Sequence, residues 1–153
     1  MTDNFFNIVL YEPQIPQNTG NIARLCACTG SSLYLVGKLG FHITDKHVKR
    51  AGLDYWDSVN INTVSTLAEL QEKFSESNFY YLSTKASKKY TETTYKKGDF
   101  LVFGSEIKGL PEEIIFNNPD KSLTIPMLDN QRSLNLSNSV SIVLYEALRQ
   151  TNF

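Results

Sequence analysis

The sequence has few of the residues that build disulfides, metal sites and histidine-based catalytic sites. Its 153 residues include two Cys, two His and one Trp. Cys26 and Cys28 lie two apart in a predicted helix, so their side chains point to different faces and favour neither a disulfide nor a metal pair. We therefore expect both to pack against neighbouring residues, and we expect no metal. Because His42 and His47 are the only histidines, the chain has few residues that could form a Ser-His-Asp site or a histidine-rich metal centre.

The sequence also lacks long apolar runs and a large charge of one sign. Hydrophobic residues make up 41% of the chain, charged residues make up 20%, and the formal net charge is −1. No apolar run reaches the roughly 20 residues of a membrane span. The charge excludes a strongly basic protein that coats nucleic acid by charge alone, although it allows a local basic patch. No signal peptide is evident, so we expect one cytoplasmic domain spanning residues 1–153, without membrane association.

Short apolar runs alternate with helical patterns along the chain. The runs at 7–11, 33–36, 79–83, 100–104 and 123–126 predict buried strands. Helical spacing occurs at 22–29, ended by Gly30, and again at 65–76 and 140–148. The alternation predicts an α/β domain with a mainly parallel sheet and a ligand site beyond the carboxyl ends of its strands. The lysine-rich segment 84–98 has the composition of a mobile surface loop, and it is also a candidate phosphate-binding segment.

Possible helix caps are present where these helical patterns begin. Asn18 or Thr19 is expected to cap the first helix, and Ser65 the second. For the last helix the candidates are Asn135, Ser137 and Asn138, which leaves the capping residue open.

The loop after the first strand does not have the glycine pattern of common nucleotide-binding domains. The chain contains no G-x-G-x-x-G after this strand and no P-loop. Instead, "NTGNIAR" places Gly20 near a helix start, where a ligand can approach, and Arg24 follows one turn later. Arg24 is compatible with an ordinary surface position and with a guanidinium directed at phosphate or at a reacting oxygen.

Two further polar loops follow later strands. In "FGSEIKGLP", Gly104 and Gly109 bracket Glu106, and Pro111 begins a short helix that opens with acidic residues, a composition that favours a ligand loop. Residues 126–141, "PMLDNQRSLNLSNSVS", are more polar than a turn requires. Because all three loops follow strands, they are expected to meet at one edge of the sheet.

These three segments, in this order, resemble the motifs of the SPOUT methyltransferases, SpoU branch: "NTGNIAR", "FGSEIKGLP" and "IPMLDNQRSLNLSNSVSIVLYEALR". The resemblance extends over nearly the whole chain. In addition, "NIVLYEPQIPQNTGNIARLC" and "KRAGLDYWD" resemble the minimal subgroup that methylates the ribose 2′-oxygen of the tRNA wobble nucleotide, the TrmL type. The lack of an appended RNA-binding domain fits this small subgroup and suggests a homodimer.

The resemblance implies a fold and a cofactor. The fold would be a mainly parallel sheet with helices on both faces and a C-terminal deep trefoil knot. The cofactor would be S-adenosylmethionine, with S-adenosylhomocysteine as product. Leu82, Ile125 and Leu134 would sandwich the adenine, and Gly104 would leave room where a side chain would collide with it. The implied cofactor-binding residues are Leu82, Gly104, Ile125, Met127, Ser133 and Leu134. Burial of the polar 126–141 segment would be compensated by hydrogen bonds within the segment and to the cofactor.

The resemblance also implies which residues act on the substrate. Arg24 would lie nearest the 2′-hydroxyl. Because an arginine is ordinarily always protonated, we favour stabilisation of the developing oxyanion, although its role as the proton acceptor stays open. Asn18 would hold the loop beside Arg24, Glu106 would order the 104–110 loop, and Ser137 or Asn138 would bond near the substrate. No metal is required.

The implied partner is the anticodon stem-loop of tRNA, methylated at a cytidine or modified uridine at position 34 in leucine tRNAs. Lys85, Lys88 and Lys89, with Arg24 and segment 46–52, would form a basic track, although 46–52 also fits a solvated helix face. Tyr55 and Trp56 fit base stacking, core packing or a dimer interface, and Tyr145 fits such an interface. Two alternatives remain: the same chemistry on another tRNA position or on rRNA, and a non-catalytic RNA-binding module.

Overall fold

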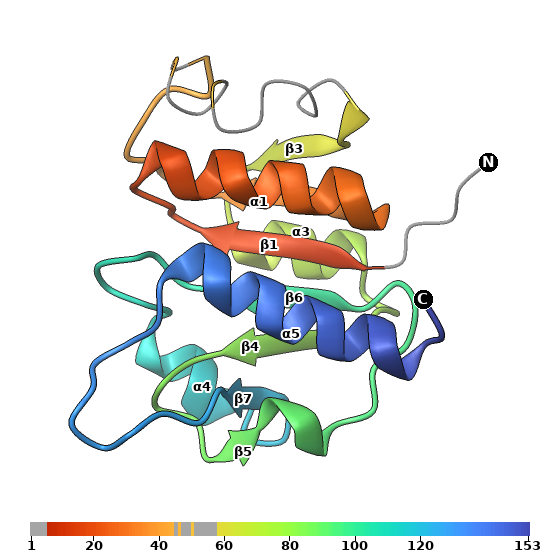
Figure 1. Cartoon of the computed structure of the whole chain (residues 1–153), viewed down its shortest axis with the longest axis vertical. Helices are drawn as coiled ribbons and strands as arrows, with labels where there is room; N and C mark the ends of the chain where they lie inside the picture. The colour runs from red at the N-terminus through yellow and green to blue at the C-terminus, as the bar shows by residue number, and fades with distance from the viewer. Residues whose placement is uncertain (1–5, 45, 47–49, 51–57) are drawn as a thin grey trace.

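The computed structural model describes residues 6–44, 46, 50 and 58–153 (Figure 1). The strands are β1 (Asn7–Tyr11), β2 (Ser32–Val36), β3 (Ile61–Val64), β4 (Phe79–Leu82), β5 (Lys88–Lys89), β6 (Phe100–Phe103) and β7 (Ser122–Thr124). The helices are α1 (Pro16–Thr29), α3 (Leu67–Lys73), α4 (Glu112–Asn117), α5 (Leu136–Gln150) and a short 3-10 helix, η2 (Tyr90–Glu92). All five predicted strands are present, which confirms the strand assignments made from the apolar runs.

The strands form one parallel sheet in the order β3-β2-β1-β6-β4-β7-β5. β1 lies in the interior, with Val9 opposite Tyr34 of β2 and Val102 of β6. Because β1, β2, β4 and β6 are buried along almost their whole length, their sequences are continuous apolar runs instead of alternating patterns. The predicted mainly parallel α/β sheet is therefore confirmed.

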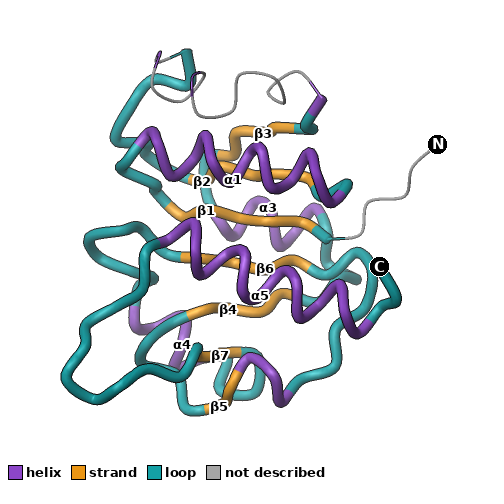
Figure 2. The backbone as a smooth tube through the Cα atoms, in the orientation of Figure 1, coloured by secondary structure: helices purple, strands orange, loops and turns teal. Residues whose placement is uncertain are grey.

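Helices cover both faces of this sheet (Figures 1 and 2). On one face, α1 and α5 lie side by side and pack over a core that includes Ile8 and Leu10. On the other face, α3 and α4 pack over a second core that includes Val9. Successive residues of β1 thus enter opposite cores, as the strand period of two requires. The predicted helices on both faces are confirmed.

The helix ends match the sequence prediction only in part. Gly30 ends α1 with a left-handed φ of 68°, and Asn135 caps α5 by accepting a hydrogen bond from the backbone N–H of Asn138 at 3.2 Å. The prediction for the start of α1 is wrong, because the helix begins at Pro16 with Ile15 as its N-cap residue. The second helix is capped by Thr66 and not by Ser65.

The prediction that 84–98 is a loop throughout is wrong, although most of its residues are exposed as a surface segment requires. This segment contains β5, which pairs with β7, and η2. Tyr95 is only 2% exposed, and its backbone N–H donates to the side-chain carbonyl of Gln150 on α5 at 2.9 Å. A buried aromatic residue and a contact with the C-terminal helix therefore anchor the segment, while none of its lysines is buried.

The knot stays a prediction. β7 lies between β4 and β5, although both precede it in the chain. The connection from β4 through β5 to β6 therefore passes around the strand that leads to α5. This is the position that a threaded C-terminal segment would have.

The two cysteines have different surroundings. Cys26 is fully buried, and burial raises the pKa of its thiol, so the expected packing role is confirmed. Cys28 is exposed, so the same expectation is wrong for it. His47, Tyr55, Trp56 and most of segment 46–52 lie outside the described residues. Among the helices that the structure describes, none is long and apolar enough to cross a membrane.

Candidate functional site

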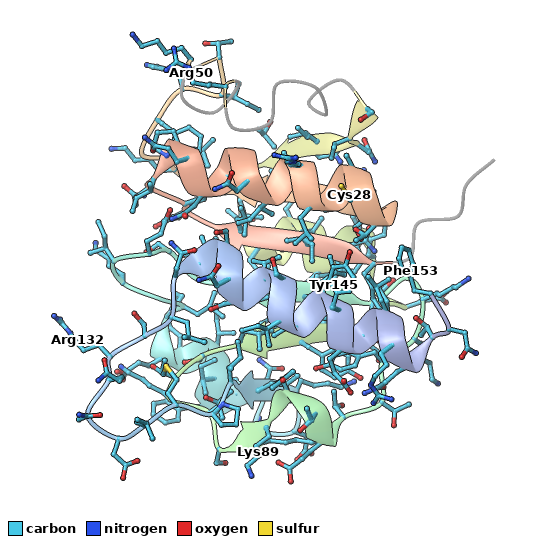
Figure 3. The ribbon with its side chains drawn as sticks, in the orientation of Figure 1. Cys28, Arg50, Lys89, Arg132, Tyr145 and Phe153 are labelled. Atoms are coloured by element: carbon cyan, nitrogen blue, oxygen red, sulfur yellow. The ribbon has the colours of Figure 1, made fainter. Side chains whose placement is uncertain are left out.

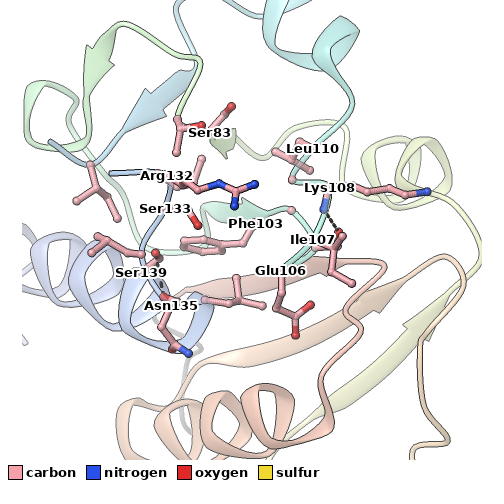
Figure 4. Close-up of a pocket in the computed structure, with 18 of the residues that line it drawn as sticks. Ser83, Phe103, Glu106, Ile107, Lys108, Leu110, Arg132, Ser133, Asn135 and Ser139 are labelled. Carbon is pink, nitrogen blue, oxygen red and sulfur yellow. Dashed lines mark hydrogen bonds between the residues drawn. The ribbon is translucent and has the colours of Figure 1, made fainter. Parts of the chain in front are cut away.

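A pocket of about 860 Å³ opens beyond the carboxyl ends of β4, β6 and β7 (Figure 4). Its walls are the ends of these strands, the 104–110 loop, the 125–135 loop, and the first turns of α1 and α5. The three polar loops thus meet at one sheet edge, as predicted from their positions after strands. The described residues that line the pocket include no His and no Cys.

All six residues that the family resemblance assigned to a cofactor line this pocket. They are Leu82, Gly104, Ile125, Met127, Ser133 and Leu134. Phe103 and Leu136 add apolar wall, and the side chains of Ser83 and Ser139 add polar groups. The volume and the mixture of apolar wall with a few polar groups are those of a pocket for an organic ligand of cofactor size.

Glu106 connects the 104–110 loop to the start of α1. One carboxylate oxygen accepts from the backbone N–H of Gln14 at 2.8 Å, and the other accepts from the backbone N–H of Ile15 at 2.9 Å. The second oxygen also accepts from the side-chain amide of Asn18 at 3.2 Å. Three donors therefore offset the negative charge of Glu106 and fix the position of the loop.

Asn135 extends this network to α5. Its amide nitrogen donates to the side-chain oxygen of Asn18 at 3.3 Å, and its oxygen accepts from the hydroxyl of Ser137 at 2.7 Å. Three predicted site residues, Asn18, Glu106 and Ser137, therefore belong to one network. The sequence analysis named Asn135 only as a possible cap, because spacing along the chain gives no sign of its contact with Asn18, 117 positions away.

Most of the polar 126–141 segment is not buried. Residues 128–135 are exposed, whereas Leu136 and Val140 on α5 are buried. Several polar side chains bond within the segment: Ser139 donates to the carbonyl of Asn135 at 3.2 Å, and Ser141 donates to the carbonyl of Ser137 at 2.9 Å. The expectation that its polar groups satisfy one another is confirmed for these residues, but the expectation of burial is wrong for the loop.

Gly104 has a structural reason that the sequence analysis did not give, and the predicted collision of a side chain with adenine stays a prediction. A Cβ atom at this position would lie 2.2 Å from the carbonyl carbon of Gly109 and 2.3 Å from the backbone nitrogen of Leu110. Backbone atoms of the same loop therefore already require glycine here. The antiparallel bridge between Ser105 and Gly109 brings the two ends of the loop this close.

We expect Gly104→Ala to destabilise the protein and to distort the pocket wall. The added methyl group must displace backbone, so the cost should be about 1–3 kcal/mol of unfolding free energy. Thermal unfolding measures this loss. Gly98→Ala is a poorer control because Gly98 has a φ of 93°, so Ser105→Ala, in the same loop, is the comparison. An unchanged melting temperature for Gly104→Ala would show that the loop can shift without cost.

Two predicted catalytic residues do not line the pocket. Arg24 is exposed on the third turn of α1 and is absent from the pocket wall, and Ser137 reaches the site only through Asn135. Among the predicted basic residues, Lys85 lines the pocket and pairs with Glu112, whereas Lys88 and Lys89 lie on β5. Figure 3 places Lys89 and Arg50 at opposite ends of the molecule. The described basic residues thus do not form one continuous track on a single chain.

A metal centre has no candidate in the part of the chain that the structure describes, since no three His, Cys, Asp or Glu side chains gather there. The expectation of metal-free chemistry stays a prediction.

Comparisons with known proteins give a consistent family assignment. Residues 6–145 match the family model described as SpoU rRNA Methylase family. A tRNA (cytidine(34)-2′-O)-methyltransferase of Methylovorus glucosotrophus is 47% identical over 149 residues, covering 97% of each chain. A solved structure that concerns the 2-OH methylation of C/U34 on tRNA is 40% identical, with a TM-score of 0.91 and 96% of each chain covered. An AdoMet-bound rRNA methyltransferase from Sinorhizobium meliloti is 25% identical, with a TM-score of 0.84, covering 97% of this chain and 57% of that one.

Proposed function

The chain belongs to the SpoU rRNA methylase family, and we propose that it methylates the ribose 2′-oxygen of the nucleotide at position 34 of tRNA, with S-adenosylmethionine as methyl donor. The observation that carries this proposal is the 47% identity to a tRNA (cytidine(34)-2′-O)-methyltransferase over 97% of both chains. The target is a cytidine or a modified uridine.

The pocket beyond β4, β6 and β7 is the proposed cofactor site. Leu82, Ile125 and Leu134 offer apolar surface to the adenine, and Met127 and Ser133 complete the wall. Bound S-adenosylmethionine supplies an activated methyl group on a sulfonium sulfur. The chain's own contribution is to exclude water and to hold the acceptor oxygen in line with that methyl group, since positioning is the principal demand of such a transfer.

The hydrogen-bond network supports the proposed catalytic roles. Glu106 and Asn135 hold Asn18 from two sides, so the start of α1 has a fixed position relative to the pocket. Ser137 is tied to Asn135 in the first turn of α5. Arg24, on α1, is proposed to stabilise the negative charge that develops on the ribose oxygen as its proton leaves.

A homodimer would bring Arg24 to a pocket. Arg24 does not line the pocket of its own chain, and α1 and α5 share one face of the sheet. Tyr145 lies on α5 and Phe153 follows that helix. The two residues are 48% and 59% exposed, and their ring centroids lie 6.4 Å apart in an edge-to-face arrangement. We propose that these apolar groups and the face formed by α1 and α5 pack against a second copy, with Arg24 of one protomer near the pocket of the other.

The proposed substrate surface is the anticodon stem-loop, and the proposed compartment is the cytoplasm, where that substrate occurs. The preference for leucine tRNAs stays a prediction from sequence.

Methyl transfer to total tRNA tests the proposal. Labelled S-adenosylmethionine is incubated with the protein and tRNA from a strain that lacks its gene, and nuclease digestion then locates the label. A 2′-O-methylated nucleotide at position 34 is the expected product. Label at another tRNA position, or in rRNA offered in parallel, would keep the chemistry and overturn the substrate. Cofactor binding without any labelled RNA would favour a non-catalytic module.

A further inference from the structure

Two cationic side chains at the pocket mouth have no acidic partner among the described residues. Arg132 lies on the 125–135 loop and Lys108 on the 104–110 loop, and both line the pocket. The acids of these loops are Glu106, which accepts three hydrogen bonds within the site, and Asp129, which forms no ion pair within the described chain. The two loops therefore carry two cations and two carboxylates, and neither cation is held by an ion pair within the described chain.

Other basic residues close to the mouth differ in this respect. Lys85 also lines the pocket, but it pairs with Glu112 at the start of α4. Arg132 and Lys108 are thus the candidates for binding an external anion. Figure 4 shows them on different loops, with the side chain of Lys108 extending outward.

Large exposed apolar side chains occur on the same two loops as the cations. Ile107 precedes Lys108 and is 76% exposed, and Leu128, four residues before Arg132, is also 76% exposed. Neither contributes to the two cores of the sheet. Two loops around one pocket that each carry a cation and an exposed apolar side chain are suited to a ligand that presents both charge and flat apolar surface.

We propose that Ile107, Lys108, Leu128 and Arg132, here called the rim, bind the RNA on either side of the nucleotide that enters the pocket. Arg132 and Lys108 contact backbone phosphates, and Ile107 and Leu128 contact the faces of unstacked bases. Phosphate contacts fix the register of a nucleic acid, and single-stranded loops present bases whose faces are free for such contacts. This inference rests on the proposed function and assigns substrate positioning to residues outside the predicted site.

A smaller anion, which is part of the cofactor and not of RNA, is the competing ligand for Arg132. The carboxylate of the cofactor's methionine part also pairs with guanidinium groups. The outward direction of Lys108 and the separation of the two cations on different loops favour a ligand larger than the cofactor. The two sources predict different losses on substitution, so binding measurements distinguish them.

Charge-removing substitutions test the cationic half of the rim. For Arg132→Gln and Lys108→Gln, binding of an anticodon stem-loop RNA is measured by fluorescence anisotropy at several salt concentrations, with S-adenosylhomocysteine present. Each variant should bind RNA about tenfold more weakly at low salt. The slope of log affinity against log salt should fall by about 0.7–0.9 per variant, since one phosphate contact is lost. Cofactor affinity should stay within twofold, and Arg132→Lys should keep the slope.

Lys73→Gln is the matched control. Lys73 is the last residue of α3 and lies near the amino ends of the strands, away from the pocket. Its replacement therefore changes the net charge by the same amount without altering the pocket mouth. An equal loss of slope for Lys73→Gln would show that only overall charge matters and would overturn the proposal. Loss of cofactor affinity in Arg132→Gln with an unchanged slope would assign Arg132 to the cofactor. If wild-type protein binds this RNA but does not methylate it, the proposed function fails while the rim is still tested.

Polar substitution tests the apolar half. Ile107→Ser and Leu128→Ser should raise KM for RNA several-fold, with an unchanged salt slope and an unchanged melting temperature, because both side chains are exposed. An unchanged KM in both variants would remove base contact from the proposal.

Discussion

Arg24→Ala is expected to abolish methyl transfer while leaving affinity for S-adenosylmethionine nearly unchanged. The guanidinium is always charged and supplies donors to a developing oxyanion, and loss of one such donor lowers kcat by roughly 10²–10³-fold. Arg24 is proposed to act on the ribose oxygen and not on the cofactor, so the cofactor should be held normally without it. Single-turnover transfer and calorimetric cofactor binding measure the two quantities. A large loss of cofactor affinity would mean that Arg24 has been assigned the wrong role.

Mixing variants tests which protomer supplies Arg24. Consider a dimer of one Arg24→Ala chain and one Glu106→Gln chain. If each pocket takes Arg24 from the other protomer, one of the two pockets in this dimer has both residues intact. If Arg24 acts across the interface, random mixing should restore about a quarter of wild-type activity, because half the dimers are mixed and each has one complete pocket. If Arg24 acts within its own chain, every pocket lacks one residue and the mixture stays inactive. The methyl-transfer activity of each variant alone is the control value for this comparison.

The sheet was predictable where burial is continuous. The runs that became β1, β2, β4, β6 and β7 are apolar because a parallel sheet covered by helices buries both faces of each strand. β3 was missed because its residues, "INTV", are only partly buried at the sheet edge. β5 was missed because a strand of two lysines has no apolar signal and depends on β7 for its definition.

The location of the candidate site could be predicted from the sequence, but most contacts within the site could not. Loops that follow parallel strands meet at one edge, so the positions of Glu106 and Ser133 followed from strand order. The contacts between loops did not follow, since Asn135 reaches Asn18 only after the chain has folded. The reason for Gly104 was likewise hidden, because it depends on how closely Gly109 approaches within the loop.

Glu106→Gln is expected to produce the second-largest loss, through position and not through proton transfer. Both carboxylate oxygens face donors: Gln14 on one side, and Ile15 and Asn18 on the other. A glutamine presents an oxygen to one side only, so its NH₂ group must oppose an N–H donor. Hydrogen bonds to a charged group are worth about 1.5–3 kcal/mol, so kcat/KM should fall by roughly 10–100-fold. Cofactor affinity should fall as well, because the same loop forms the pocket wall.

Two controls separate this network from the surface charge around it. Glu112→Gln removes an equal charge from an exposed ion pair with Lys85, which is worth at most about 1 kcal/mol, and it should leave activity nearly unchanged. Glu106→Asp keeps the charge but is one methylene shorter, so it should recover part of the loss. If Glu106→Asp were as active as wild type, the charge alone would suffice. If it were as inactive as Glu106→Gln, the reach of the carboxylate to the backbone of residues 14 and 15 would be the decisive property. The second outcome would mean that the distance between the 104–110 loop and α1 determines whether the three loops form one site.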